Sequence, residues 1–407
     1  MSASLFANLE LAPHDPILGV TEAYHADQNP NKVNLGVGVY TDDAGKVPVL
    51  ECVRTAEQRL IEKPLARNYL PIDGLKNYDR AVQEVVFGTE SAALKEGRII
   101  TVQTLGGTGG LKVGADLMRR VNPEAQVWIS DPSWENHRAL FEYAGYQVNT
   151  YPYYDPATHG LKFEAMIKCL ESLPSGSVVL LHACCHNPTG VDLKEDQWAR
   201  VLQTVNKRGL VPFLDLAYQG FAEGLDADAA AVRRFSDACP VAFVSSSFSK
   251  SLSLYGERVG AFSIVTQDAS EVTKVLSQLK RVIRTNYSSP PTHGGQTVAT
   301  VLTTPELRAL WERELGEMRD RIKVMRRQLV EKIRGVRADF DFSFVAEQRG
   351  MFSYSGLNRE QVRRLREEYS VYAIDSGRIC VAALNSHNVD YVAKAIGTVL
   401  VETVPAG

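Results

Sequence analysis

Residues 177–190 read SVVLLHACCHNPTG and residues 211–220 read VPFLDLAYQG, and each stretch joins an apolar run to a polar or glycine-containing turn. Apolar side chains at successive positions are typical of strands that are buried on both faces of a mostly parallel sheet. The middle of the chain repeats this pattern and predicts strands at residues 127–130, 177–182, 211–216, 241–245 and 259–265. Because helical patterns alternate with these strands, the sequence predicts an α/β fold in which helices cover a central sheet.

The ends of these strands indicate where a ligand binds. The first four predicted strands run directly into the segments DPSWENH, CCHNPTG, AYQG and SSFSK. In open α/β sheets the ligand lies outside the carboxyl ends of the strands. We therefore expect these four segments to line one site.

A second, smaller domain is predicted after the sheet. At 407 residues the chain exceeds the size at which a single hydrophobic core usually stops growing. Apolar residues recur at three- and four-residue steps from Pro305 to Arg334, which predicts a long helix running from the large domain into the small one. The remainder follows an α/β sandwich pattern, with strands predicted at residues 342–345, 351–355 and 378–382, and helices predicted at 359–370 and from about Val389.

Composition and charge favour a protein that acts on small molecules. The formal net charge of -3 supplies no basic field for nucleic acid or anionic lipid. No apolar stretch approaches the ~20 residues needed to span a bilayer and no signal peptide is recognisable, so we expect a soluble, cytoplasmic protein. The six cysteines form no CxxC pair, and His182 and His186 lie on a strand leading into a proline turn instead of on one helical face. We therefore expect no metal site.

Lys250 is the strongest chemical clue. It lies in SSSFSKSLSLYGERVG at residues 245–260, where hydroxyl side chains surround a lysine after a buried strand and Arg258 stands eight positions later. A lysine acts as a Schiff-base nucleophile only when its amine is partly neutral, and burial beside other cations lowers its pKa. The hydroxyls and Arg258 can hold a phosphate. An isolated lysine is usually a surface residue, but this context favours a site for a carbonyl cofactor.

Asp215 ends the apolar run VPFLDL, where burial of an unpaired carboxylate would cost several kcal/mol. Two interpretations are about equally supported by this residue alone. It can cap a helix by accepting backbone amides, or it can pair with the protonated ring nitrogen of pyridoxal phosphate, which makes that cofactor an electron sink. Tyr218, three residues on, can donate to the phenolic oxygen of the cofactor, although a lone tyrosine is more often part of the core.

Three further segments give weaker signals. Residues 104–121, TLGGTGGLKVGADLMRRV, join a strand end to a glycine-rich turn and an amphipathic helix, which would aim backbone amides at a phosphate. This segment does not match the dinucleotide-binding pattern G-x-G-x-x-G. HNPTG at residues 186–190 places an amide side chain on a proline-fixed turn, and Trp134 offers a flat face for a pyridine ring. Taken singly, an ordinary loop and a core aromatic explain these two features.

Ten segments, in order along almost the whole chain, resemble the class I aminotransferases, and within them the aspartate and aromatic amino acid aminotransferases. These segments are LGVGVY (35–40), RNYLPIDG (67–74), QTLGGTGGLKVGAD (103–116), DPSWENH (131–137), CCHNPTG (184–190), FLDLAYQGF (213–221), SFSKSLSLYGERVGA (247–261), IRTNYSSPP (283–291), QRGMFSY (348–354) and SGRICVA (376–382). The resemblance implies the type I pyridoxal-phosphate fold, with a large domain built on a mostly parallel central sheet and a smaller α/β domain.

The resemblance also implies roles for individual residues. Lys250 would carry pyridoxal 5'-phosphate as a covalent aldimine and, once displaced by substrate, serve as the base and acid of the proton transfer. Asp215, supported by His137, would pair with the pyridine nitrogen. The other implied cofactor ligands are Asn187 and Tyr218 on the ring oxygen, Trp134 on the ring face, and Gly107, Thr108, Ser247 and Arg258 on the phosphate. Trp134 and Asn187 would also border the substrate, and Tyr218 would belong to the catalytic group.

Two implied contacts come from a second subunit, so the active unit would be a homodimer. Tyr69 resembles a phosphate ligand contributed by the partner, and Arg284 matches the partner-subunit arginine that binds the distal carboxylate of aspartate or glutamate. Arg378 resembles the arginine that grips the substrate α-carboxylate, a task suited to a planar guanidinium. Gly38 would close over the substrate when the small domain moves.

The expected domain division follows from these assignments. We expect an N-terminal arm at residues 1–13, part of the small domain at 14–46, the large cofactor-binding domain at 47–313 and the rest of the small domain at 314–407. The first dozen residues lack periodicity, and we expect them to reach another subunit as an extended arm.

The expected substrates are amino acids and 2-oxo acids. Arg284 predicts dicarboxylic substrates, because an aromatic side chain beside it would leave a guanidinium unpaired at a cost of about 3–5 kcal/mol unless the arginine swings out to solvent. DPSWENH, CCHNPTG, SLYGERVG, NYSSPP and QRGMFSYSGL look closer to the aromatic enzymes, whereas Val39, Asn68 and Thr108 look more like the aspartate enzymes. We expect transfer from tyrosine, phenylalanine and aspartate to 2-oxoglutarate, with a strict aspartate aminotransferase as the alternative.

Other functions fit fewer of these residues. A decarboxylase or carbon–sulfur lyase on the same fold would share Lys250, Asp215 and Arg258, but two arginine clamps on both substrate carboxylates favour transamination. A ligand-sensing regulator would need a DNA-binding module, for which the sequence offers no helix-turn-helix pattern ahead of Leu35.

Overall fold

The computed structural model describes residues 4–11, 16–63, 66 and 68–400. Residues 1–3 and 12–13 of the expected arm lie outside the described residues, as do residues 14–15 and 401–407 of the expected small domain and 64–65 and 67 of the expected large domain. Within the described ranges, none of the helices combines the length and apolar character that crossing a membrane requires.

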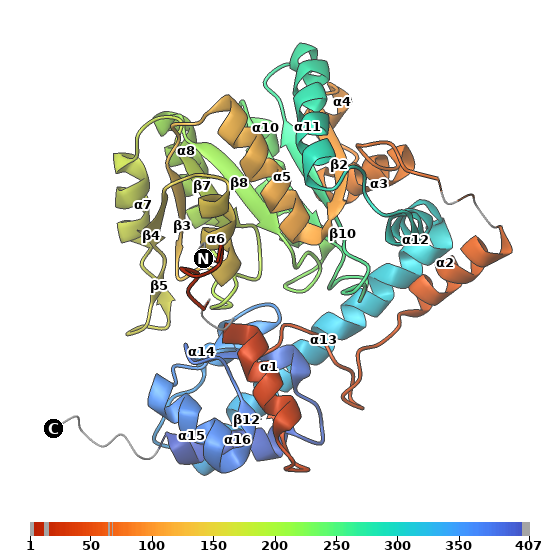
Figure 1. Ribbon diagram of the computed structural model, residues 1–407. Coiled ribbons are helices and arrows are strands. Elements are labelled where there is room, and N and C mark those ends of the chain that lie inside the picture. Colours follow the sequence, from red (N-terminus) through yellow and green to blue (C-terminus); the bar gives the residue numbers. More distant parts are fainter. Residues whose placement is uncertain (1–3, 12–15, 64–65, 67, 401–407) are drawn as a thin grey trace.

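A seven-stranded sheet forms the centre of the protein (Figure 1), with the order β2-β10-β9-β8-β7-β3-β4. Its strands are β2 (Ile99–Leu105), β3 (Val127–Asp131), β4 (Val148–Pro152), β7 (Val178–His182), β8 (Val211–Leu216), β9 (Ala242–Ser247) and β10 (Val259–Val265). Only β10 runs antiparallel to its neighbours within this sheet. The mostly parallel sheet is confirmed, and the predicted bounds of β8 and β10 agree with the structure, whereas β4 has no counterpart among the predicted strands.

Helices cover both faces of this sheet, as the alternating pattern predicts (Figure 1). One face packs against α5 (Gly106–Val121), α6 (Glu135–Tyr143) and α11 (Val272–Asn286) in a shared apolar cluster. The α5 helix lies especially close, because a Cβ on Gly114 would stand 2.6 Å from Phe262 and 2.7 Å from Phe213. The other face belongs to a larger cluster that includes α2 (Glu51–Glu62), α3 (Lys76–Phe87), α7 (Phe163–Ser172), α8 (Glu195–Arg208), α10 (Ala230–Ala238) and α12 (Thr292–Thr303).

The long predicted helix is present as α13 (Pro305–Val336) and joins the sheet region to the C-terminal region. Trp311 near its start is buried and donates to the Ser251 carbonyl 2.7 Å away, whereas Ile333 near its end is buried in the C-terminal region. The C-terminal region also holds α1 (Pro16–Ala26), α15 (Arg359–Tyr369), α16 (Val389–Val399), β1 (Val33–Asn34), β11 (Phe352–Tyr354), β12 (Val371–Tyr372) and β13 (Arg378–Cys380). Residues near both ends of the chain meet there, since β1 pairs with β12 in parallel.

The remaining elements are short. They are α4 (Ala92–Lys95), α9 (Leu225–Asp228), α14 (Phe344–Glu347), the strands β5 (Tyr154–Asp155) and β6 (Gly160–Leu161), and the 3-10 helices η1 (Ala269–Glu271) and η2 (Val381–Ala383).

Two local predictions are wrong. The strand predicted at residues 342–345 is absent, and α14 begins within it. The alternation of Phe340, Phe342 and Phe344 resembles a strand, but the Asp341 carboxylate accepts the Ser343 amide at 2.9 Å and so turns the chain. The glycine-rich turn predicted before α5 is also absent, because the helix itself begins at Gly106.

Candidate active site

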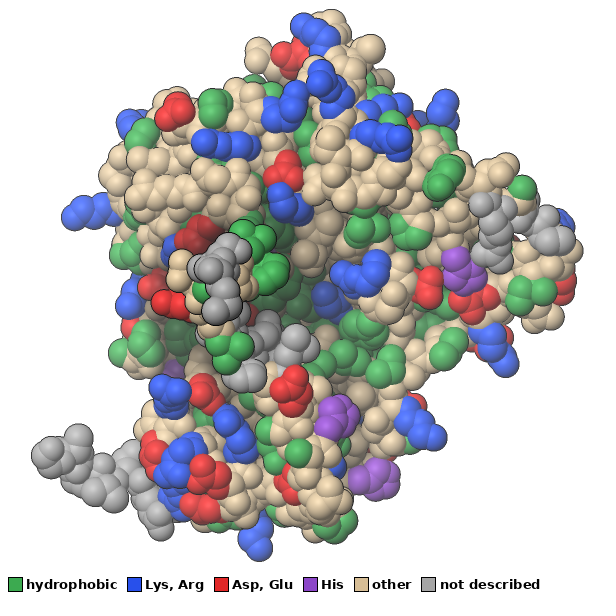
Figure 2. All heavy atoms as spheres, in the orientation of Figure 1, with side chains coloured by type: hydrophobic (Ala, Val, Ile, Leu, Met, Phe, Trp, Pro, Cys, Tyr) green, Lys and Arg blue, Asp and Glu red, His purple; other side chains and the backbone are tan. Residues whose placement is uncertain are grey.

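The carboxyl ends of β3, β7, β8 and β9 converge on one cavity of about 290 Å³. Each of the four polar segments predicted to line a site contributes to it, through Trp134, Asn187, Tyr218 and Lys250 respectively. The other lining residues are Gly38, Gly107, Thr108, Leu111, His182, Asp215, Ala217, Ser247, Ser249, Tyr255 and Arg258. Figure 2 shows this face of the protein hollowed between the part that holds the sheet and the part around α14–α16.

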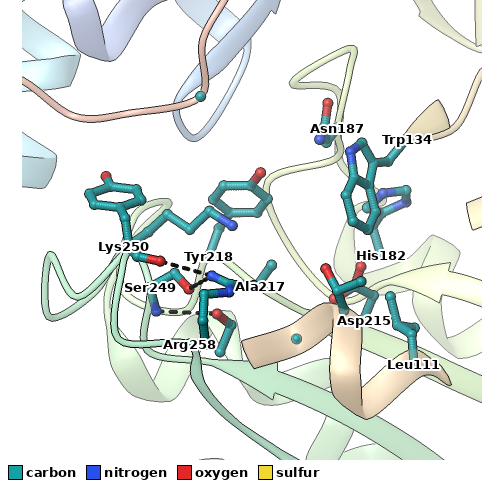
Figure 3. Close-up of a pocket in the computed structure, with 15 residues that line it drawn as sticks. Leu111, Trp134, His182, Asn187, Asp215, Ala217, Tyr218, Ser249, Lys250 and Arg258 are labelled. Atoms are coloured by element: carbon teal, nitrogen blue, oxygen red, sulfur yellow. Dashed lines mark hydrogen bonds between the residues drawn. The ribbon is translucent and has the colours of Figure 1, made fainter. Parts of the chain in front are cut away.

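Lys250 follows β9 and lines this cavity, with its amine directed toward the Tyr218 ring (Figure 3). The Nζ atom lies 5.0 Å from the centre of that ring. Burial lowers the pKa of the amine to about 8; Asp215 opposes this shift and Arg258 adds to it. A sizeable fraction of the amine is therefore neutral near neutral pH, as a nucleophile that attacks a carbonyl requires.

Asp215 lies on the opposite side of the cavity from Lys250, next to the last residue of β8 (Figure 3). His137 Nε2 is 2.9 Å from Asp215 Oδ2, and Ser133 Oγ is 2.9 Å from His137 Nδ1. Burial by itself would raise the pKa of Asp215, but the hydrogen bond from His137 and the nearby cationic groups hold that pKa below its usual value. The carboxylate is thus ionised inside the protein and can balance a cationic ring nitrogen.

An anion-binding end of the cavity lies at the start of α5. Gly107 and Thr108 stand in the first turn of this 16-residue helix, where free backbone amides favour a negative charge. Arg258 faces the same turn: its Nη1 donates to the Tyr255 carbonyl at 2.9 Å and to Ser249 Oγ at 3.4 Å. Amides, hydroxyls and a guanidinium are the donor set that a phosphate prefers.

Arg378 lies close to the cavity on β13, although it does not line it. Its Nη2 donates to the Gly36 carbonyl at 2.7 Å and its Nη1 to Asn187 Oδ1 at 3.3 Å. The side chain is 1% exposed, and its Nε is buried with no hydrogen-bond partner among the described residues. A buried guanidinium with an unused donor is suited to a carboxylate ligand.

Two of the predicted site residues, Tyr69 and Arg284, lie outside this cavity. Tyr69 is 93% exposed, and Arg284 is exposed at the end of α11, where it donates to the hydroxyl of Ser288. Both were expected to serve the site of a partner subunit, and their exposure is compatible with that expectation. His137 does not line the cavity either, because it stands behind Asp215.

Sequence reasoning missed Leu111, His182 and Tyr255 as residues that line the cavity, and it gave no individual role to Ala217 and Ser249, which lie in the segments expected to line the site. Ser249 and Tyr255 carried a usable signal, since both lie in the segment around Lys250. His182 is buried, and neither ring nitrogen has a partner among the described residues. Burial lowers its pKa to about 3, so it contributes a neutral imidazole. His137, His182 and Asp215 could each offer one atom to a metal ion, but His137 and Asp215 already use these atoms on each other.

The cavity thus combines an anion-binding end with a buried carboxylate and, on the opposite side from that carboxylate, a partly neutral amine. This donor set fits a flat, phosphate-bearing aldehyde with a basic ring nitrogen, and the unpaired nitrogens of His182 show polar capacity that the protein alone leaves unused. Fold and site together describe an α/β protein whose cavity offers a lysine amine, a buried carboxylate and donors suited to an anionic ligand.

Comparison with known proteins identifies the family. The family described as aminotransferase class I and II matches residues 30–396. An aspartate aminotransferase of Pseudomonas aeruginosa is 58% identical over 98% of this chain and 100% of its own length. A solved aromatic-amino-acid aminotransferase from Burkholderia pseudomallei, covalently bound to pyridoxal phosphate, is 61% identical with a TM-score of 0.96 over 98% of this chain and 100% of that chain. The chain belongs to the class I and II aminotransferases, as its ten segments predicted.

A third relative is an aromatic enzyme that was solved with an acidic amino acid. It is a psychrophilic aromatic amino acids aminotransferase from Psychrobacter, solved with aspartic acid, and it is 47% identical with a TM-score of 0.96 over 98% of this chain and 100% of that chain.

Proposed function

We propose that this chain transfers the amino group of tyrosine, phenylalanine and aspartate to 2-oxoglutarate, with pyridoxal 5'-phosphate bound covalently at Lys250. The observation that carries this proposal is the buried amine of Lys250, whose pKa of about 8 leaves part of it neutral. Burial and Arg258 lower this pKa, and Asp215 opposes them. Membership of the aminotransferase family and the cofactor bound to the Burkholderia relative support it. Pyridoxal phosphate supplies the electron sink and carries the amino group between the two halves of a ping-pong cycle.

We propose the following roles for the residues in and behind the cavity. Lys250 would move the proton at the substrate Cα, since its amine lines the cavity and is partly neutral near neutral pH. Asp215, held ionised by His137, keeps the ring nitrogen protonated. Gly107, Thr108, Ser247 and Arg258 would hold the phosphate, Trp134 would stack on the ring, and Asn187 and Tyr218 would bind the ring oxygen; all seven line the cavity.

Substrate carboxylates would be bound by two arginines. Arg378 presents its buried, partly unpaired guanidinium for the α-carboxylate. Arg284 would bind the distal carboxylate in the site of a partner subunit, where Tyr69 would reach the phosphate, so we propose a homodimer. Exposure of Arg284 and Tyr69 in the single chain supports this arrangement.

We also propose that the two ends of α13 serve different domains, with the division at residues 47–313 and 14–46 plus 314–407. The β1–β12 pair, which joins the N-terminal and C-terminal stretches, supports this division. Closure of the small domain would bring Gly38 over the substrate and exclude water. The six free cysteines among the described residues suit a reducing compartment, and we propose the cytoplasm.

We expect Arg284 to determine the substrate range. The same guanidinium would face the distal carboxylate of aspartate and the aromatic ring of phenylalanine or tyrosine. The experiment compares kcat/KM for aspartate and for phenylalanine in the native protein and in Arg284→Leu. We expect both amino acids to be substrates of the native protein and the variant to lose about a hundredfold or more on aspartate only, as one buried ion pair is lost. Negligible phenylalanine turnover by the native protein would instead establish the strict aspartate enzyme. Loss of carbon dioxide from the substrate would rule out transamination.

A further inference from the structure

Arg326 is a buried arginine on α13 that lies outside the cavity and has uncharged acceptors only. It is 2% exposed, and its Nη1 donates to the Val345 carbonyl at 3.1 Å and to the Ser353 hydroxyl. Its Nη2 donates to the carbonyls of Gly350 at 2.6 Å and Phe352 at 3.2 Å. Burial lowers the pKa of this guanidinium to about 10, which leaves it charged at neutral pH. One cation thus fixes four acceptors of a single short stretch of chain.

The stretch that Arg326 holds runs from Val345 in α14 to Ser353 in β11. This strand pairs with β13, so that Tyr354 stands opposite Arg378. The same stretch also contacts the turn that carries Asn187, since the Arg349 amide donates to the Gly190 carbonyl at 2.7 Å. A Cβ on Gly190 would lie 2.6 Å from the Phe352 carbonyl oxygen, so the turn and the strand are in close contact.

Phe352, within this stretch, contacts residues that would handle the substrate. The Arg378 guanidinium carbon lies 4.5 Å from the centre of the Phe352 ring, within the range of a cation–π interaction. A Cβ on Gly38 would lie 2.6 Å from Phe352 Cζ, so this ring also borders the segment expected to close over the substrate. Tyr218 meets the same ring in an edge-on arrangement, with ring centres 5.9 Å apart.

We propose that Arg326 is a positioning residue for substrate binding: by fixing the backbone of β11 it holds Phe352 against Arg378 and sets the orientation in which Arg378 receives the α-carboxylate. Three features support this role. The guanidinium fork reaches two different acceptors with each terminal nitrogen, which a lysine cannot reproduce. The four acceptors lie within residues 345–353, and three of them fall within residues 350–353, so their loss would free one segment. The guanidinium itself has no access to the cavity. This inference rests on the proposed function, because it takes Arg378 as the ligand of the α-carboxylate.

Two variants test the proposal in the cofactor-loaded protein. Ser353→Ala removes one acceptor without leaving a carbonyl unpaired, and we expect it to raise KM for aspartate and for phenylalanine about tenfold. Arg326→Gln removes the guanidinium and its four hydrogen bonds. We expect KM to rise about a hundredfold while kcat changes less than about threefold. The affinity for pyridoxal phosphate should stay within about threefold of the native value in both variants.

Arg98→Gln is the control, because Arg98 is another arginine that is mostly shielded from solvent and donates to a carbonyl, that of Thr266 at 3.0 Å, away from β11 in the fold. Unlike Arg326, it also pairs with a carboxylate, that of Glu96 at 2.7 Å. Its KM should match the native value even if its melting temperature falls.

A double-mutant cycle separates positioning from general destabilisation. In an Arg378→Lys background the effect of Ser353→Ala on KM should nearly vanish, since both changes act on the same carboxylate contact. An undiminished effect in that background, or an unchanged KM in both Ser353→Ala and Arg326→Gln, would overturn the proposal. If Arg326→Gln fails to fold, Ser353→Ala and its cycle still decide. Absence of transamination by the native protein would contradict the proposed function instead, so the two failures are distinguishable.

Discussion

His137 Nε2 lies 2.9 Å from Asp215 Oδ2, with His137 fully buried and Asp215 only 6% exposed. A carboxylate this deeply buried would ordinarily take up a proton, because burial penalises its charged form. The hydrogen bond from His137, which Ser133 orients from behind, reverses that tendency and holds the pKa of Asp215 low. The protein therefore maintains a fixed negative charge at one end of the cavity and a partly neutral amine, Lys250, facing it.

Replacing this charge should slow the chemical step. Asp215→Asn keeps the size of the side chain but removes the partner of a protonated ring nitrogen. Breaking such a buried pair costs about 3–5 kcal/mol, so we expect kcat to fall by roughly two to four orders of magnitude. His137→Asn leaves the carboxylate in place and should cost only about tenfold, the loss of one hydrogen bond. Steady-state kinetics at saturating substrate give kcat for both variants. A kcat for Asp215→Asn within tenfold of the native value would contradict the role of the carboxylate.

The pKa of Lys250 predicts a pH dependence for cofactor attachment. At a pKa of about 8, roughly a tenth of the amine is neutral at pH 7, against fewer than about one in a thousand at the ordinary value. The rate at which the cofactor-free protein takes up pyridoxal phosphate covalently should therefore rise about fivefold from pH 7 to pH 8 and level off above about pH 9, at roughly tenfold the rate at pH 7. A rise that continued unchanged toward pH 10 would show that the amine is not perturbed. Lys250→Ala should form no covalent adduct and show no multiple turnover.

The same pKa fixes the sign of a stability effect. The folded pKa of Lys250 lies below the unfolded value, so between about pH 8 and pH 10.4 the unfolded chain binds more protons than the folded one. The free energy of unfolding of the cofactor-free protein should thus gain a positive slope with pH in this window. Chemical denaturation of the native protein and of Lys250→Met, compared at each pH, isolates this contribution, because the variant cannot titrate there. An identical slope in the two proteins would be incompatible with a buried, perturbed amine.

Phosphate binding should depend on the absence of a side chain at Gly106. Its φ is +66° and a Cβ there would lie 2.6 Å from Arg258 Nη2, so Gly106→Ala adds both backbone strain and displacement of the guanidinium. Gly97→Ala is the matched control, because Gly97 has a φ of +69° and nothing within 4 Å of an added Cβ. We expect similar losses of stability from strain, about 1 kcal/mol each. Only Gly106→Ala should weaken binding of pyridoxal phosphate, by about tenfold or more. Equal affinities of the two variants for pyridoxal phosphate, measured by fluorescence titration, would argue against phosphate binding beside Gly106 and Arg258.

Most of the sheet and the centre of the site could be predicted because their signals are local. Lys250 and Asp215 each follow an apolar strand, and the carboxyl ends of parallel strands must meet at one edge of the sheet. The position of Arg378 near the cavity, by contrast, came from the family resemblance, since nothing in its own segment shows that it meets Asn187 across 191 positions of sequence.

What the sequence could not show depends on distant partners or on a single local contact. Arg326 looks like one more cation on an amphipathic helix, and only the fold shows that it is buried against β11. The phenylalanines at alternate positions up to the start of α14 resemble a strand. The chain turns there instead, where the Asp341 carboxylate accepts a hydrogen bond from the Ser343 amide. His182 carries no recognisable motif, and its unpaired nitrogens become visible only once the cavity around it is formed.

Close packing of α5 against the sheet gives a last prediction, in which two glycine-to-alanine changes have opposite signs. A Cβ on Gly114 would overlap the rings of Phe262 and Phe213 at 2.6 and 2.7 Å, and both rings lie in a packed sheet that cannot yield easily. Overpacking of this kind costs about 1–3 kcal/mol. Gly335, near the end of α13, has nothing within 4 Å of an added Cβ, so alanine there should instead stabilise the protein by about 0.5–1 kcal/mol through helix propensity. Because α5 also places Gly107 and Thr108 at the phosphate end, Gly114→Ala should weaken cofactor binding as well, whereas Gly335→Ala should not. Denaturant unfolding and cofactor titration of the two variants check both signs, and a stabilised Gly114→Ala protein would show that the helix can move away from the sheet at no cost.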